Sequence, residues 1–160
     1  MSEGMAEILL VEDNPNDLEL ALHAFKKNGL SNRIQVARDG AEALDYLFHR
    51  AASGASAPSE ASDASGVSGA DLLLPRVVLL DLKLPKVDGI EVLRQVKSNP
   101  RTRKLPVVVM TSSRQDRDID ECYSLGANSY IVKPVDFDKF MAAVSILATY
   151  WLLYNQPSAI

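Results

Sequence analysis

The sequence has one cysteine, no long apolar run and no excess of basic residues. Cys122 stands alone, so no internal disulfide can form, and a reduced, buried thiol is its expected state. No apolar stretch reaches the roughly 18 residues that suggest a membrane span, and the N-terminus lacks the pattern of a secretory signal. The net charge of −4 disfavours binding to nucleic acid or an anionic membrane surface. These absences predict a cytoplasmic protein that binds neither DNA nor membrane.

Apolar residues are plentiful, at 47% of the 160 residues, which fits one domain with a sizeable core. Runs that are apolar throughout and end in a polar group are typical of parallel strands covered on both faces. They lie at residues 8–13, 77–81, 107–111 and 130–133. In open α/β sheets the site lies at the carboxyl ends of the strands. We therefore expect one crevice to contain Glu12, Asp13, Asp81, Thr111 and Lys133.

Helical patterns alternate with these strands, and a further short strand is expected near residues 33–37. The predicted helices are 15–28, 40–50, 90–99, 116–125 and one from Phe137 toward Trp151. Alternating strands and helices with right-handed crossovers give an α/β fold, a doubly wound five-stranded parallel sheet of order 2-1-3-4-5. Its switch point lies between strands one and three, so Asp13 and Asp81 should flank it.

Composition divides the chain into a domain over residues 5–148 and an aromatic C-terminal extension over 149–160. Within the domain, residues 52–70 are almost entirely Ala, Ser, Gly, Pro and acids, without periodicity. Such a segment cannot bury enough apolar surface to offset its ordering entropy. We predict a flexible insertion between the second helix and the third strand.

The expected crevice holds three carboxylates, which repel one another unless a cation lies between them or one of them takes a proton. Oxygen ligands select a hard cation, and Mg²⁺ commonly takes one or two carboxylates together with phosphate oxygens and water. The sequence therefore predicts a Mg²⁺ site with Asp13 and Asp81 as direct ligands and Glu12 acting mostly through water.

A phosphoryl donor held at such a cation can be attacked in line by an aspartate, which gives an aspartyl phosphate. Asp81 is the predicted nucleophile. Thr111 could donate its hydroxyl to a phosphoryl oxygen, and Lys133 could pair with the same charge. Singly, Thr111 could be a turn residue and Lys133 a solvated strand end. Their joint occurrence at consecutive strand ends favours the functional interpretation.

Four motifs carry a resemblance to the receiver domain of two-component response regulators, and together they span most of the chain. They are Val11-Glu12-Asp13-Asn14, residues 80–89, Met110-Thr111-Ser112-Ser113 and Val132-Lys133-Pro134-Val135. The resemblance implies a flavodoxin-like receiver fold and a phosphoacceptor with slow self-dephosphorylation rather than an enzyme. It implies that Asp81 accepts phosphate from a sensor kinase histidine, that Glu12 and Asp13 serve Mg²⁺, and that Thr111 and Lys133 sense the phosphoryl group.

Three further roles follow from the same resemblance. Lys83 stands where the family often has Asn, and its main-chain carbonyl would be the third protein ligand of Mg²⁺. Tyr130 matches the switch aromatic that turns inward as Thr111 moves, although an ordinary half-buried strand tyrosine fits the pattern equally well. Pro134 matches the family's cis-peptide site, whereas composition alone predicts a trans bond.

The sequence shows no output domain after the receiver pattern, so we expect the signal to leave through a protein contact. The extension is unusually aromatic, and exposed apolar patches mark interfaces. We predict a homodimer with Tyr150, Trp151, Leu152 and Leu153 as anchors; the alternative is an extension packed back on its own domain. The tail and the loops resemble single-domain regulators paired with bacterial phytochrome kinases, which implies a bacteriophytochrome as kinase.

Three other functions compete with this interpretation. A flavodoxin-like FMN protein would need a Ser-, Thr- and Gly-rich phosphate loop after the first strand, where this chain has Glu12-Asp13-Asn14-Pro15. A phosphatase of the haloacid dehalogenase type would have an Asp at the position of Lys83. A phosphorylation-independent pseudo-receiver is disfavoured by the intact set of Asp81, Thr111 and Lys133.

Overall fold

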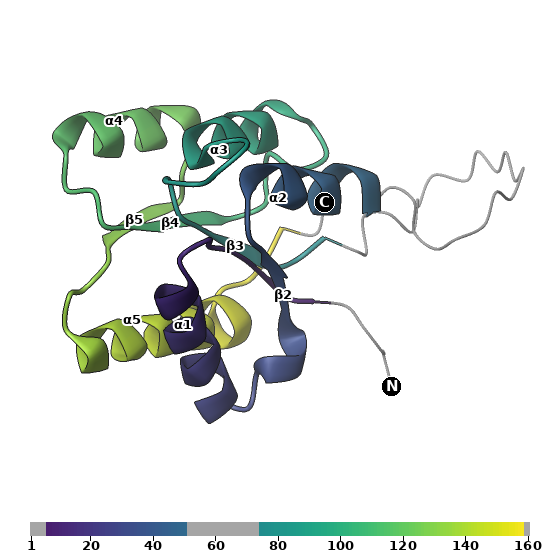
Figure 1. The fold of residues 1–160 in the computed structure, drawn as a ribbon. Coiled ribbons are helices and arrows are strands. Elements are labelled where there is room, and N and C mark those ends of the chain that lie inside the picture. Colours follow the sequence, from purple (N-terminus) through teal and green to yellow (C-terminus); the bar gives the residue numbers. More distant parts are fainter. Residues whose placement is uncertain (1–5, 51–73, 159–160) are drawn as a thin grey trace, which may run out of the picture.

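The computed structural model describes residues 6–50 and 74–158 (Figure 1), so the insertion predicted at 52–70 lies outside the described residues. Five strands form one parallel sheet in the order β2-β1-β3-β4-β5, which confirms the predicted topology. They are β1 (Ile8–Val11), β2 (Ile34–Ala37), β3 (Val77–Leu80), β4 (Val107–Thr111) and β5 (Ser129–Val132).

The central strands β1, β3 and β4 are buried along their whole lengths, as their uninterrupted apolar sequences predict. The register pairs Val11 with Leu80 and Leu80 with Val109. The carboxyl ends of these strands are therefore nearly level. Residues that follow each strand are brought to one edge of the sheet, at the left in Figure 1, where the loops after β4 and β5 also lie.

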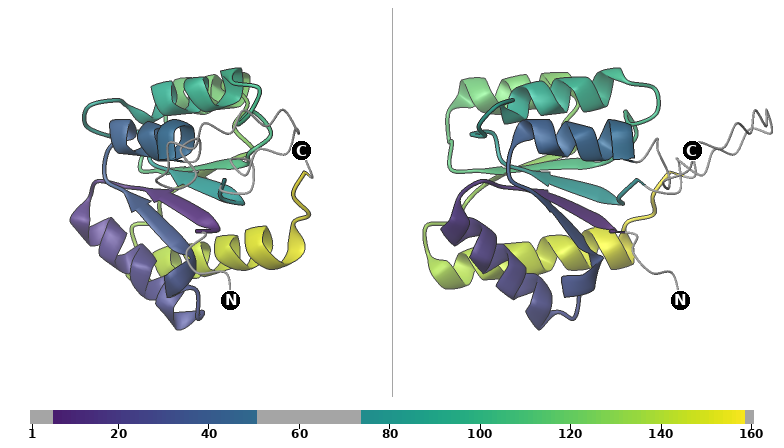
Figure 2. Two further views of the ribbon diagram at one scale, coloured as in Figure 1. Left: turned by 90° about the vertical axis from the view of Figure 1, so that its right-hand side faces the viewer. Right: turned by 45° about the vertical axis from the view of Figure 1, so that its right-hand side comes forward.

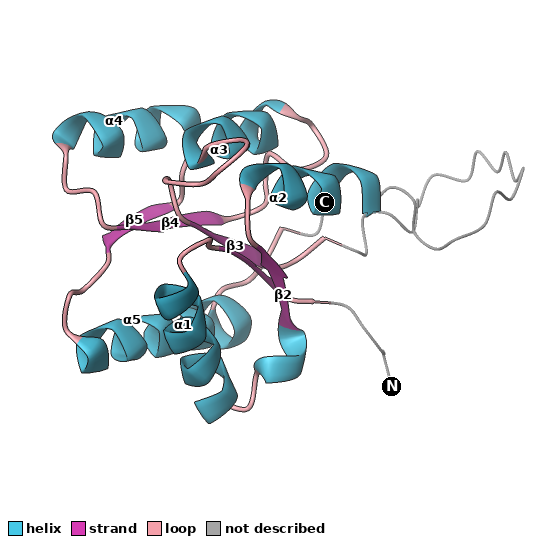
Figure 3. Cartoon of the chain, viewed as in Figure 1, coloured by secondary structure: helices cyan, strands magenta, loops and turns pink. Residues whose placement is uncertain are grey.

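Helices cover both faces of the sheet (Figures 2 and 3). One face carries α1 (Pro15–Lys27) and α5 (Phe137–Thr149), and the other carries α2 (Gly40–Asp45), α3 (Gly89–Ser98) and α4 (Asp116–Leu125). A separate apolar cluster fills the space on each side. A short 3₁₀ turn, η1 (Ser31–Arg33), precedes β2. The two cores hold the sheet edge rigidly between helix layers.

Side-chain caps fix where four of the helices begin. Asn14 accepts hydrogen bonds from the backbone N–H groups of Asn16 (2.9 Å) and Asp17 (3.1 Å), and Pro15 occupies the first helical position. Aspartates cap the others in the same way: Asp39 for α2, Asp88 for α3 and Asp136 for α5. The cap of α1 places Asp17 in its first turn, above the end of β1.

Two helices end in a π-helical turn. The α-helix α2 stops at Asp45 and continues as a π-helical turn, η2 (Tyr46–Arg50), and α5 stops at Thr149 before η4 (Tyr150–Tyr154). In η4 the N–H of Asn155 donates to the carbonyl of Tyr150, five residues earlier, at 2.7 Å. The helices predicted toward Arg50 and Trp151 are therefore confirmed, and the structure adds that the last turn of each is π-helical, which apolar periodicity does not distinguish from an α turn.

The Lys133–Pro134 bond is trans, as are all described peptide bonds, so the cis bond implied by the family resemblance was wrong for this structure. The trans isomer agrees with the intrinsic preference of X–Pro bonds. Among the described helices, none has the length and apolar content needed to cross a membrane.

Candidate functional site

The carboxyl edge of the sheet brings three acids together, as predicted. Glu12 follows β1 and is 4% exposed, Asp81 follows β3 and is 7% exposed, and Asp13 is exposed at the rim. One carboxylate oxygen from each lies within 4.8 Å of the others. Two buried carboxylates and a third at the surface form an acidic pocket that opens to solvent through Asp13.

Lys133 follows β5 and reaches into this pocket with a side chain that is 9% exposed. Its Nζ donates to Glu12 Oε2 at 2.7 Å, to Asp17 Oδ2 at 2.8 Å and to Asp81 Oδ2 at 3.0 Å. An ammonium has three protons, so all three are engaged by carboxylates. Lys133 thus pairs with the Asp81 carboxylate itself, and its pairing with a phosphoryl group stays a prediction.

The pocket shifts the pKa values of both Glu12 and Lys133. Burial raises the pKa of Glu12 from 4.5 to about 7; the hydrogen bond from Lys133 opposes this shift, and the charge of Asp81 adds to it. Burial alone would lower the pKa of Lys133. The hydrogen bonds to Asp17 and Glu12 and the charge of Asp81 outweigh burial and raise that pKa above 10.5. Lys133 is thus a permanent cation, whereas Glu12 titrates near neutrality.

The donor set of the pocket fits a hard divalent cation, because every available ligand atom is a carboxylate or carbonyl oxygen. The oxygens of Glu12 are already engaged, Oε1 by the N–H of Asn14 at 3.0 Å and Oε2 by Lys133. Within residues 6–50 and 74–158, Asp81 Oδ1 has only a long contact, 3.4 Å, from the N–H of Lys83. Asp13 and Asp81 are therefore freer to bind Mg²⁺ directly than Glu12, and the Lys83 carbonyl stays a predicted ligand.

Thr111 is fully buried at the end of β4, and its carbonyl accepts a hydrogen bond from the N–H of Lys133 at 2.7 Å. Its Oγ1 accepts a long hydrogen bond, 3.4 Å, from the N–H of Ser113. The hydroxyl of Tyr130 donates to the carbonyl of Ser113 at 3.0 Å, and Ser113 Oγ donates to Asp118 at 2.5 Å. Tyr130 lies partly buried against the core on the α3–α4 side. The two predicted switch residues are thus joined through one loop residue.

Asp17 is the site residue that sequence reasoning missed. It lies in the first turn of α1, and its side chain is 27% exposed. An acid in the first turn of a helix is ordinarily explained by the helix dipole, so it gave no signal of its own.

The C-terminal residues divide between core and surface. Leu152 is buried in the core beneath α1 and α5, and its carbonyl accepts a hydrogen bond from Arg76 Nη1 at 3.2 Å. Trp151 is half-buried with its ring edge-on to that of Tyr150, at 5.0 Å between centroids. Tyr150 and Leu153 are exposed. Leu152 as an interface anchor was therefore wrong, because it continues the buried stripe of α5, four residues after Ala148.

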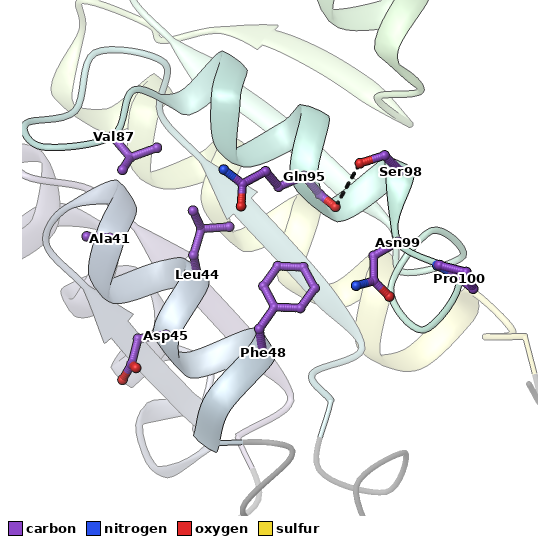
Figure 4. Close-up of a pocket in the computed structure, with 9 residues that line it drawn as sticks. All are labelled: Ala41, Leu44, Asp45, Phe48, Val87, Gln95, Ser98, Asn99 and Pro100. Carbon is purple, nitrogen blue, oxygen red and sulfur yellow. Dashed lines mark hydrogen bonds between the residues drawn. The ribbon is translucent and has the colours of Figure 1, made fainter.

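A cavity of about 660 Å³ lies away from the acidic pocket, between α2 and α3. Figure 4 shows Leu44 and Phe48 of the α2–η2 segment facing Gln95 across it. None of its lining residues belongs to the acidic pocket, and it contains no cluster of acids or cations. Among the described residues, the acidic cluster lies at the sheet edge and not in this cavity.

Comparison with known proteins agrees with this geometry. Residues 8–145 match the family described as response regulator receiver domain. The probable methanogenesis regulatory protein FilR2 of Methanothrix harundinacea (strain 6Ac) is 44% identical over 149 residues, which cover 93% of this chain and 85% of that protein.

Solved structures share the fold. The phosphorylated cyanobacterial phytochrome response regulator RcpA has a TM-score of 0.77 at 33% identity, covering 98% of this chain and 100% of that one. The bacteriophytochrome response regulator RtBRR is 44% identical with a TM-score of 0.63, over 98% of this chain and 86% of that one. With the same flavodoxin-like sheet order and with Asp13, Asp81 and Lys133 gathered at its edge, this chain belongs to the response regulator receiver domain family.

Proposed function

We propose that this protein accepts a phosphoryl group on Asp81 from a histidine of a sensor kinase and relays the signal through contact with another protein. One observation carries the proposal. The Asp81 carboxylate faces the Lys133 ammonium at 3.0 Å and shares a pocket within 4.8 Å with oxygens of Glu12 and Asp13. A nucleophile, a fixed cation and an oxygen cluster for a metal are the parts that phosphoryl transfer requires.

In the proposed reaction an Oδ atom of Asp81 forms a bond to phosphorus as the bond from phosphorus to the phosphohistidine nitrogen breaks. The electron pair stays on the imidazole, which takes up a proton from solvent. Lys133 offsets negative charge on the phosphoryl oxygens from a fixed position. Bound Mg²⁺ would add charge neutralisation at those oxygens, held by Asp13, Asp81 and the carbonyl of Lys83, with Glu12 acting through water.

The proposed switch runs from Thr111 to Tyr130. A phosphoryl oxygen on Asp81 would accept a hydrogen bond from the Thr111 hydroxyl, whose oxygen has, among the described residues, only a 3.4 Å contact from the N–H of Ser113. Moving Thr111 alters the loop at Ser113, which bonds both the Tyr130 hydroxyl and Asp118 at the start of α4. The change would therefore emerge on the surface formed by α4 and β5.

The surface beside Lys133 is suited to docking of a protein that donates a phosphoryl group. Val135, in the connection from β5 to α5, is 95% exposed, and Phe137, the first residue of α5, is 63% exposed. Both lie within four residues of Lys133. Exposed apolar side chains next to a polar pocket are typical of a recognition site. We propose that a sensor kinase docks there. The likeness to phytochrome response regulators supports a bacteriophytochrome as that kinase.

The outer face of α5 and η4 is the proposed homodimer interface. Four large side chains are exposed along it: Ile146, Tyr150, Leu153 and Tyr154. Aromatic and aliphatic side chains of this size dominate interface energetics, and a two-fold contact needs only one self-complementary patch. Because Leu152 belongs to the core, Tyr150 and Leu153 remain as exposed anchors of the proposed interface. Trp151 is half-buried beside Tyr150.

The phosphoacceptor is tested with acetyl phosphate and Mg²⁺, followed by mapping of the adduct by mass spectrometry. We expect one phosphoryl group on Asp81, none on the Asp81→Asn variant and none in excess chelator. Asp120→Asn, which removes an equally charged but exposed acid on α4, should be labelled like the native protein. Label on another residue, or retained by Asp81→Asn, contradicts the proposal. Phosphotransfer from a panel of sensor kinases then identifies the donor.

A further inference from the structure

Asp17 is the one carboxylate on the Lys133 ammonium that neither follows a strand nor belongs to the metal cluster. Its Oδ2 lies 2.8 Å from Nζ, between the partner oxygen of Glu12 at 2.7 Å and that of Asp81 at 3.0 Å. It comes from the first turn of α1, whose position is fixed by the Asn14 cap and by packing against α5. Asp17 thus holds the ammonium from the helix side of the pocket.

The other two acceptors have competing tasks. Asp81 uses its oxygens for the proposed chemistry, and Glu12 contributes to the proposed Mg²⁺ site while its Oε1 accepts from Asn14. The side chain of Asp17 contacts Lys133 and no other described residue of the pocket. It is therefore the acceptor that stays available to Lys133 when phosphorus is bonded to Asp81.

We infer that Asp17 is a positioning residue for phosphorylation: it keeps the Lys133 ammonium placed to meet the incoming phosphoryl oxygens. This inference rests on the proposed role of Asp81. Without Asp17, the charge of Lys133 would be shared by two acids instead of three. The ammonium would draw closer to Asp81, making that carboxylate less nucleophilic, and its long side chain would be less constrained for the phosphoryl group.

Removing Asp17 also removes a negative charge that repels the anionic phosphoryl donor. This second effect would raise the rate of phosphorylation. Asp17 is partly exposed, and charges at an exposed site are screened by water and salt. Loss of the direct, charge-assisted hydrogen bond to a side chain that is only 9% exposed is the larger effect. The expected net result is slower phosphorylation.

The test is the rate constant for phosphorylation of Asp81 by acetyl phosphate at saturating Mg²⁺. We expect Asp17→Ala to lower it by about tenfold, the order expected for one charge-assisted hydrogen bond, with Asp17→Asn intermediate. Glu19→Gln, an exposed acid two residues further along α1, should react within about twofold of the native protein, the scatter expected of surface changes.

A double-mutant cycle separates positioning from a general structural effect. Lys133→Ala should lower the rate constant, and adding Asp17→Ala should then change it by less than about twofold. An unchanged rate in Asp17→Ala overturns the inference, and so does a further tenfold loss in the Lys133→Ala background. The underlying proposal fails in a different way, through label on Asp81→Asn or a native rate in Lys133→Ala. Circular dichroism of each variant establishes that it is folded.

Discussion

Gly40 lies against the main-chain carbonyl of Val87, and a Cβ atom at position 40 would be only 1.8 Å from that oxygen. The N–H of Gly40 also donates to the carbonyl of Pro85, at 3.4 Å. The first residue of α2 therefore packs directly on the loop that leaves Asp81. Glycine is needed here for space, since a side chain of any size would push the loop away.

Gly40→Ala should accordingly destabilise the protein and disturb the site. Overpacking of this kind typically lowers the free energy of unfolding by about 1–3 kcal/mol, and displacement of the loop should also slow phosphorylation of Asp81. Urea unfolding and the acetyl phosphate reaction measure the two effects. Gly29→Ala is the control, because its Cβ would meet nothing within 4 Å and only its φ of +70° would be strained. Equal behaviour of the two variants in both measurements would contradict the packing argument.

Glu12 should make stability and Mg²⁺ binding depend on pH. Because burial raises its pKa from 4.5 to about 7, the folded state binds more protons than the unfolded state between these values. Without Mg²⁺, the stability that protonated Glu12 contributes is complete below pH 4.5 and is lost as pH rises through about 7.

Mg²⁺ favours the carboxylate, so its affinity should rise across the same range and its binding should release protons. Thermal melts in chelator and in Mg²⁺ measure both effects. Glu12→Gln should flatten the dependence, whereas Glu19→Gln should not. An undiminished pH slope in Glu12→Gln would rule out this assignment.

Val135 and Phe137, beside Lys133, should affect the rate of phosphoryl transfer from a kinase but not from a small-molecule donor. Replacing both Val135 and Phe137 by Ser should reduce transfer from the cognate kinase by about tenfold or more, as expected for exposed interface anchors. The reaction with acetyl phosphate and the melting temperature should stay near native, because neither side chain supports the core. Tyr123→Ser, at an exposed aromatic on α4, is the control. Equal losses with the kinase and with acetyl phosphate would show that the variant damages the pocket instead.

Self-association should depend on the outer face of the C-terminal turn and not on its inner face. Ile146→Ser with Leu153→Ser should raise the dimer dissociation constant by about tenfold or more with little change in stability. Leu152→Ala should instead lower the free energy of unfolding by about 2–5 kcal/mol, the cost of a core cavity.

Sedimentation and urea unfolding separate these outcomes. Truncation after Thr149 would change self-association and stability together, because it removes both the outer and the inner face of the C-terminal turn. A native protein that is monomeric at micromolar concentration, with and without acetyl phosphate, would exclude the dimer.

The sequence predicted the sheet well because its buried strands are apolar throughout and each ends in a chemically distinctive residue. Glu12, Asp81, Thr111 and Lys133 could be placed together since the ends of neighbouring parallel strands must meet. The contact of Asp17 with Lys133 could not be predicted, because it depends on where the first turn of α1 lies relative to the residue that follows β5. Periodicity describes one element at a time and contains no such information.

The same limit explains why the contact at Gly40 was missed. Asp39-Gly40 was correctly placed at the start of a helix, but the approach of Val87 to that glycine is tertiary and leaves no local signal. Leu152 is different, because it lies four residues after Ala148 and eight after Val144, on the buried stripe of α5. Helical periodicity was sufficient to place it inward, and the prediction of an interface anchor did not use that periodicity.

The three carboxylate acceptors around Lys133 also restrict which basic side chain can occupy position 133. They converge on a single nitrogen from a strand end, a helix turn and a second strand end. An ammonium directs three protons outward from one tetrahedral atom, whereas a guanidinium spreads its N–H groups in a plane over three nitrogens. Arginine would carry the same charge and still leave at least one carboxylate without its donor. The shape of the acid cage, and not its charge, makes lysine the side chain that completes it.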